Sequence, residues 1–120
     1  MKVLACGSRG YPDDDVYTWW DEIFSDLAPV EVLVHGDCRG PDQVSGAWFD
    51  EKVPAAEVIA MPADWNRHGR AAGFIRNEQM LDQQKPDLVV AFWDGQSRGT
   101  AHTIAEAAKR GIPVRVLPPR

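Results

Sequence analysis

The stretch AFWDGQSRGTAHTIAEA, residues 91–107, decides the fold class. It opens with the end of an apolar run, passes through glycine, serine and arginine, and resumes with the apolar spacing of a helix. A buried strand that leads through a short loop into a helix is one unit of an α/β fold. Because the loop adds a cation and two hydroxyls to its glycines, it also indicates a seat for an anion.

The rest of the chain repeats this unit. Apolar runs with the length of strands occur at residues 3–6, 30–35, 58–61, 88–92 and 114–117. They are nearly continuous in apolarity, which is typical of parallel strands buried on both faces. Stripes of helical spacing lie between them. The alternation predicts an α/β fold: a single Rossmann-like doubly wound sandwich, with about five mostly parallel strands and helices on both faces.

Composition limits the classes of protein. The 120 residues, 44% of them hydrophobic, suffice for one domain over residues 1–120 whose core needs no disulfide or metal. A net charge of −5 argues against general binding of nucleic acid. No segment has the length of a membrane span or of a signal peptide's core, so we expect a cytoplasmic protein without membrane association. Cys6 and Cys38 are expected to be free thiols, and no metal site is expected.

Ligands of open parallel sheets bind beyond the carboxyl ends of the strands. Glycine, hydroxyl and arginine side chains accumulate at these predicted strand ends, which predicts a site for a phosphate-bearing ligand. We expect Asp42 to accept a hydrogen bond from a ribose hydroxyl. The candidate contacts are Gly7, Ser8 and Arg9 after the first strand, Gly36, Arg39, Gly40 and Asp42 after the second, and Gly95, Gly99 and Thr100 after the fourth.

Arg76 gives separate support for an anion site. It shares a predicted helix face with Ala72 and Met80, so we expect it to be half buried. A guanidinium in that position needs an anion, which is either an internal carboxylate or a ligand phosphate. The glycine-rich strand ends favour the ligand.

The polar stretch PADWNRHGRAAG, residues 62–73, is longer than a usual connection. We expect it to be a mobile lid that closes over the ligand, with Asp64, Trp65 and His68 among the contacts. Trp65 and Trp93 both follow predicted strands, where each ring either stacks on a nucleobase or packs within its loop.

Four blocks of the sequence resemble one known family: GSR at residues 7–9, HGDCRGPD at 35–42, PADWNRHGRAAGFIRNEQM at 62–80, and the Gly-Thr pair at 99–100. Together they are similar to the YspA, cpYpsA-related branch of the SLOG superfamily, and the match spans nearly the whole chain. Relatives include the LOG phosphoribohydrolases and the DprA DNA-processing proteins. The resemblance implies a Rossmann-like fold that binds nucleotides or nucleotide-derived ligands, such as a nucleoside monophosphate or an ADP-ribose-like molecule, with no required cofactor.

The resemblance also sets the candidate catalytic residues. LOG enzymes cleave the N-glycosidic bond with an arginine of an Arg-Lys pair and with a glutamate that follows a Gly-Thr loop. Arg76 and Asn77 resemble the first element, and residues 94–100 resemble an altered form of that loop. The glutamate is missing: the first acid after Thr100 is Glu106.

The leading hypothesis is therefore a protein that binds a nucleotide-type ligand. The alternative is an N-glycosidase or nucleotide hydrolase in which Glu106, Asp94 or Asp64 replaces the missing acid. A third hypothesis is a DprA-like module for single-stranded DNA, against which the acidic composition argues. Because related proteins often pair through helices, a homodimer is also expected.

Overall fold

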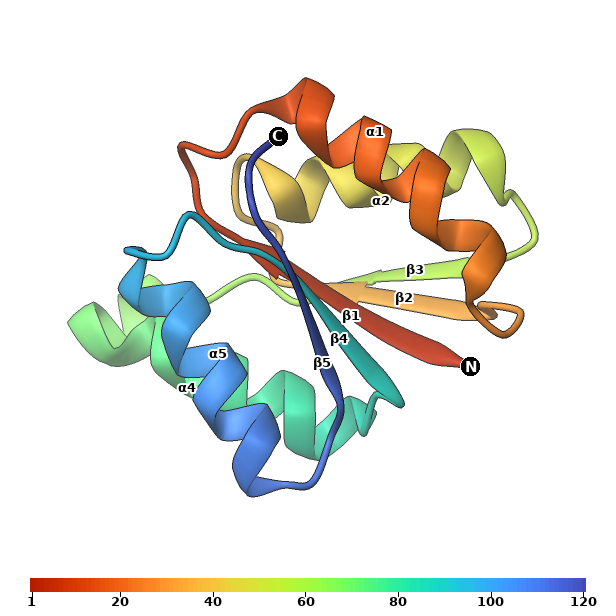
Figure 1. Cartoon of the computed structure of the whole chain (residues 1–120). Coiled ribbons are helices and arrows are strands. Elements are labelled where there is room, and N and C mark those ends of the chain that lie inside the picture. Colours follow the sequence, from red (N-terminus) through yellow and green to blue (C-terminus); the bar gives the residue numbers. More distant parts are fainter.

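The computed structural model describes residues 1–120 and contains one sheet of five strands, with the spatial order β3-β2-β1-β4-β5. All neighbouring strands are parallel. The direction of winding changes between β1 and β4, which lie side by side at the centre (Figure 1). The predicted α/β class is therefore confirmed. The strands are β1 (Lys2–Gly7), β2 (Val32–His35), β3 (Glu57–Ala60), β4 (Leu88–Phe92) and β5 (Val114–Leu117).

Helices cover both faces of the sheet (Figure 1). One face carries α1 (Asp13–Ile23) and α2 (Pro41–Lys52), and the other carries α4 (Ala72–Gln79) and α5 (Arg98–Lys109). Pro41 occupies the first turn of α2, where its missing N–H has no intrahelical partner to lose. A π-helical turn (Met80–Gln84) extends α4.

The two faces have different cores. Under α1 and α2 the core is aromatic: the ring of Trp20 stacks on Trp48 with centroids 5.7 Å apart and meets Phe49 edge-on at 5.0 Å. We call this the aromatic cluster, and Val3, Val16 and Phe92 are among its other members. Under α4 and α5 the buried residues are smaller and mostly aliphatic: Leu4, Cys6, Val34, Met80, Leu81, Val89, Ala91 and Ala107.

Two expectations about local structure are wrong. The strands expected at residues 58–61 and 114–117 form, as β3 and β5, but they are not buried on both faces: each is an edge strand with only one neighbour and has partly exposed side chains. The stretch from Pro62 to Gly73 is not a plain loop, since it contains the short helix α3 (Trp65–His68) and a 3₁₀ turn (Gly69–Ala71) that leads into α4. Asp64 starts α3 because its Oδ1 accepts the N–H of Arg67 at 3.1 Å. Closure of this segment over a ligand stays a prediction.

The helices are short relative to a bilayer. None of them combines the length and the apolarity that crossing a membrane requires.

Candidate functional site

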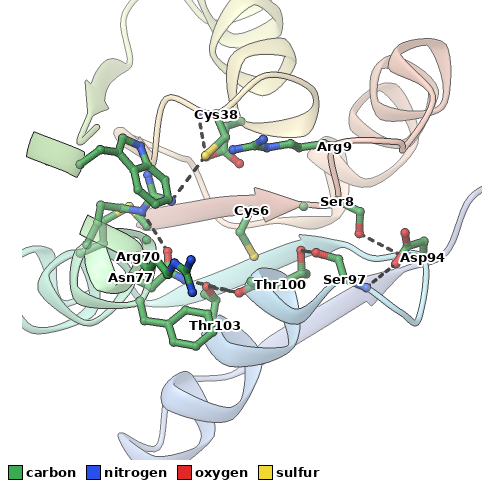
Figure 2. A pocket seen from close by; sticks show the side chains of 18 residues that line it. Cys6, Ser8, Arg9, Cys38, Arg70, Asn77, Asp94, Ser97, Thr100 and Thr103 are labelled. Atoms are coloured by element: carbon green, nitrogen blue, oxygen red, sulfur yellow. Dashed lines mark hydrogen bonds between the residues drawn. The ribbon is translucent and has the colours of Figure 1, made fainter. Parts of the chain in front are cut away.

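A cavity of about 450 Å³ opens at the carboxyl ends of β1 and β4, where the strand order changes direction. This is the place at which open α/β sheets bind ligands. The side chains around it come from β1, from the segments after β1, β2 and β4, and from α3, α4 and α5 (Figure 2). We refer to it as the pocket.

One end of the pocket is formed by the β4–α5 connection and is rich in hydroxyls. Asp94 folds this connection, because its Oδ1 accepts the N–H groups of Ser97 at 2.9 Å and of Gln96 at 2.8 Å. These hydrogen bonds, first that of Ser97 and then that of Gln96, lower the pKa of Asp94. Buried Ser8 accepts the N–H of Asp94 at 3.3 Å, and Thr100 lies beside Ser97 (Figure 2).

The N-terminus of α5 faces the pocket at this end. Gly99 and Thr100 lie in its first turn and line the cavity. Ser97 makes no side-chain cap to the first amides of the helix. Uncapped N–H groups and the helix dipole together attract a negative charge.

The first turn of α2, directly after the β2–α2 loop, contributes Asp42. This side chain is buried, and its Oδ2 accepts the N–H groups of Gly36 at 2.9 Å and of Cys38 at 3.3 Å. Burial raises the pKa of Asp42 to about 6, while the two N–H groups and the charge of Arg76 oppose the increase. Oδ1 makes no hydrogen bond within the protein, although Asp42 lines the pocket.

Arg76 crosses from α4 to the same loop and is 8% exposed. Its Nη1 donates to the carbonyl oxygen of Gly36 and, at 3.4 Å, to that of Met61. Nε donates to Asn77 Oδ1 at 2.9 Å, and Nη2 lies 3.5 Å from Cys38 Sγ. No carboxylate lies within 4.0 Å, so the alternative of an internal ion pair does not apply, and the side chain, expected to be half buried, is more buried than that.

Gly36 makes this arrangement possible. A Cβ at that position would overlap the guanidinium of Arg76. Glycine therefore permits the loop and the arginine to meet, although Gly36 itself does not line the pocket.

Asn77 connects the pocket to α5. Its Oδ1 accepts from Arg76, which directs Nδ2 toward the carbonyl oxygen of Gly99 at 3.4 Å and toward His102 Nδ1 at 3.4 Å. Thr103, one turn after Gly99, donates to the same carbonyl oxygen at 3.3 Å and lines the pocket. These contacts join α4 to the start of α5.

The mouth of the pocket carries exposed aromatic and cationic side chains. Trp65 is 53% exposed and Phe74 is 46% exposed, whereas large apolar side chains elsewhere are mostly covered. Arg70 lies at this end, and Arg9 extends over the pocket toward Cys38 (Figure 2). Trp93 is not part of the lining: its Nε1 donates to the carbonyl oxygen of Ser97 at 3.1 Å, so the ring belongs to its own loop.

The charge of the pocket differs from that of the whole chain. Three arginines line it, Arg9, Arg70 and Arg76, against two aspartates, Asp42 and Asp94. None of the three arginines forms an ion pair with a carboxylate. In a protein with a formal net charge of −5, this is a local excess of positive charge.

The structure brings ten of the predicted site residues together around the pocket: Gly7, Ser8, Arg9, Asp42, Trp65, Arg76, Asn77, Asp94, Gly99 and Thr100. Seven others do not line it. Gly36 and Gly40 shape the β2–α2 loop, and Asp64 caps α3. The seven predicted residues that do not line the pocket are Gly36, Arg39, Gly40, Asp64, His68, Gly95 and Glu106.

Glu106, one of the candidate catalytic residues, lies outside the pocket and is held in ion pairs. Its carboxylate binds Lys109 Nζ at 2.7 Å and Arg110 Nη1 at 3.1 Å, and these two partners lower its pKa. Its Oε atoms also lie near Glu78 and His102, with the donor atoms of the three residues within 4.8 Å of one another. Because two cations already neutralise Glu106, we assign this cluster to helix pairing and not to a metal.

Several lining residues were not predicted to bind the ligand: Cys6, Cys38, Arg70, Gly73, Phe74, Met80, Ser97 and Thr103. Two of them carry a readable signal. Thr103 follows Gly99 at helical spacing, so it shares the face of that residue. Cys6 directly precedes the first strand exit. Burial raises the pKa of the Cys6 thiol, which keeps it neutral.

Comparison with known proteins adds one relative. No family model matches the chain. The chain is similar to the Gene 61 protein of Mycobacterium phage D29, with 38% identity over 119 residues, covering 94% of this chain and 93% of the phage protein.

Proposed function

The chain belongs to the family of the phage D29 Gene 61 protein, and from the chemistry of the pocket we propose that it binds a nucleotide or nucleotide-derived ligand. The observation that carries the proposal is Arg76, a buried cation that lines the pocket and has no carboxylate partner. A buried charge is costly unless it is compensated, and a ligand anion would supply the compensation.

The two ends of the pocket suit the two parts of such a ligand. The uncapped first turn of α5, with Gly99, Thr100 and the hydroxyl of Ser8 nearby, suits a phosphate. Trp65 and Phe74 at the mouth suit a flat base, since exposed aromatic rings stack on such groups. The resemblance to the SLOG superfamily supports the same class of ligand.

Binding is favoured over hydrolysis by the LOG route. Glu106 lies outside the pocket in ion pairs, Asp64 caps a helix, and Asp94 is occupied by two backbone N–H groups. Glu106 and Asp64 do not line the pocket, and Asp94, which does, has a lowered pKa that favours its ionised form over the protonated form that a general acid needs.

The test is a titration of the wild type with AMP, ADP-ribose and ribose 5-phosphate, followed by calorimetry. Arg76→Ala should weaken binding of the phosphate-bearing ligand roughly ten- to a hundred-fold, because a charge-assisted contact is lost. Arg115→Ala, which removes an arginine on β5 outside the pocket, is the matched control and should bind as the wild type does. If none of the three ligands binds the wild type, or if Arg76→Ala binds normally, the proposal is wrong.

A further inference from the structure

Asp42 and Arg76 are a buried anion and a buried cation that line one pocket without forming an ion pair. Both side chains form a hydrogen bond to Gly36. The N–H of Gly36 donates to Asp42 Oδ2, and the carbonyl oxygen of Gly36 accepts from Arg76 Nη1. The loop therefore fixes the two charges close to each other. Any anion that enters beside Arg76 also approaches Asp42.

The two carboxylate oxygens of Asp42 are not equivalent. Oδ2 accepts both backbone N–H groups, from Gly36 and from Cys38. A proton therefore belongs on Oδ1, which has no hydrogen bond within the protein. An ionised Asp42 repels a ligand anion, whereas a protonated Oδ1 offers an O–H donor to it.

We infer that Asp42 couples anion binding in the pocket to uptake of one proton from solvent at Oδ1. This inference rests on the proposed function, because it concerns the same site and the same class of ligand. The site then holds a fixed-charge anion tightly when Asp42 is protonated and loosely when it is ionised.

The groups around Asp42 agree with this assignment. The charge of Arg76, from α4, favours the ionised form of Asp42, and the charge of Asp37, from the β2–α2 loop, opposes it. Cys6 of β1 is a neutral thiol because burial raises its pKa. Arg9 lines the pocket from the β1–α1 connection. Burial dominates, so the pKa of Asp42 is about 6 in the free protein, and an anion beside Arg76 would raise it further.

The experiment uses sulfate, whose charge is constant over the range from about pH 5 to about pH 8, at fixed ionic strength. Binding to the wild type is followed by backbone amide NMR shifts. The affinity should fall by about tenfold in total between about pH 5 and about pH 8, with the steepest part of the decrease between about pH 6 and about pH 7, since one unit of pKa difference between the free and bound states corresponds to that factor. Asp42→Asn should bind sulfate with the same affinity throughout the range.

Asp50→Asn is the matched control, because Asp50 is an exposed carboxylate on the same helix, outside the pocket. It should keep the pH dependence of the wild type. A second measurement needs no variant: the carboxyl ¹³C signal of Asp42 should titrate near pH 6 in the free protein and about one pH unit higher with sulfate.

The outcomes separate the two proposals. If sulfate binds the wild type with an affinity independent of pH, or if Asp42→Asn keeps the slope, proton coupling is wrong and the proposed function stands. If neither sulfate nor AMP binds at any pH, the proposed function fails and the coupling fails with it.

Discussion

The aromatic cluster and the pocket use burial in opposite ways. In the cluster, Trp20, Trp48 and Phe49 bury large apolar rings, and the Nε1 of Trp20 is satisfied by Ser45 Oγ at 2.9 Å. Of the nine buried polar or charged residues, six line the pocket: Ser8, Asp42, Arg76, Asn77, Thr100 and Thr103. Apolar burial stabilises a fold, whereas burial of polar groups costs free energy unless they are well paired. The aromatic cluster therefore stabilises the fold, and the burial of polar groups around the pocket lowers that stability.

The largest effect is expected in the aromatic cluster. Trp20→Ala should lower the free energy of unfolding by about 3 to 5 kcal/mol, because the ring is fully buried between Trp48, Phe49 and Phe92. Urea denaturation measures the loss. Trp19→Ala is the matched control, since that neighbouring ring is only partly buried and should cost much less. Equal losses from the two variants would contradict the division of roles.

The next effect tests the pocket and has the opposite sign. The pKa of Asp42 is about 6 in the folded state, against an ordinary value of 3.8, so the folded state binds a proton that the unfolded chain releases between these values. The contribution of Asp42 is least unfavourable below about pH 4, and stability falls as the pH rises through about 6. At pH 7 the ionised side chain costs about 3 kcal/mol, for a pKa difference of about 2.

Asp42→Asn should therefore be more stable than the wild type at pH 7, by up to about 3 kcal/mol, and similar to it at about pH 4. The amide keeps an oxygen for the N–H groups of Gly36 and Cys38. Denaturation curves at the two pH values give the difference. A variant that is less stable than the wild type at pH 7 would show that the carboxylate is well compensated.

Two glycines sharpen the comparison at intermediate size. A Cβ at Gly7 would lie 2.7 Å from the carbonyl oxygen of Phe92 and 2.6 Å from the ring of Pro41, neither of which can move freely. A Cβ at Gly36 would meet the end of the Arg76 side chain, which can shift. Gly7→Ala should cost about 2 to 3 kcal/mol of stability, and Gly36→Ala about 1 kcal/mol.

The two variants should rank in the opposite order for ligand affinity: Gly36→Ala should lose more affinity than Gly7→Ala, although it loses less stability. Gly36→Ala displaces Arg76 and should weaken ligand binding more than its small loss of stability suggests. Gly10→Ala serves as the control, because a Cβ there meets nothing within 4 Å. If Gly7→Ala proves harmless to stability, the close packing of β1, β4 and the start of α2 is wrong.

The strands were readable from the sequence because each is a compact apolar run, and the ends of all five were placed within one or two residues. The edge position of β3 could not be read from the sequence, since the order in which strands pair depends on contacts between distant segments. The helix at Trp65–His68 had a local signal, the cap by Asp64, which the polar composition of the stretch concealed.

The pocket divides in the same way. Its glycine and hydroxyl residues follow from the rule on strand ends, because that rule needs only the chain order. The partners of Arg76 do not, since the carbonyl oxygens of Gly36 and Met61 reach it from two separate strand ends. The position of Glu106 was readable, because Arg110 follows it at the spacing of helical ion pairs.

The smallest effect on stability is expected at the mouth of the pocket. Trp65 is 53% exposed, so Trp65→Ala should change the free energy of unfolding by less than about 0.5 kcal/mol. Its effect on binding depends on the ligand. If the ring stacks on a base, AMP should lose about 1 kcal/mol, roughly a fivefold loss of affinity, while ribose 5-phosphate, which has no base, should bind unchanged.

Trp65→Phe is the control for this last prediction, because it keeps a ring that can stack and should retain most of the affinity for AMP. Calorimetry with the two ligands gives four ratios, one for each variant and ligand. A loss shared equally by AMP and ribose 5-phosphate would mean that Trp65 shapes the pocket without touching a base. A loss confined to AMP would mean that the exposed ring, which adds almost nothing to the fold, is retained for the ligand, as the contrast with buried Trp20 requires.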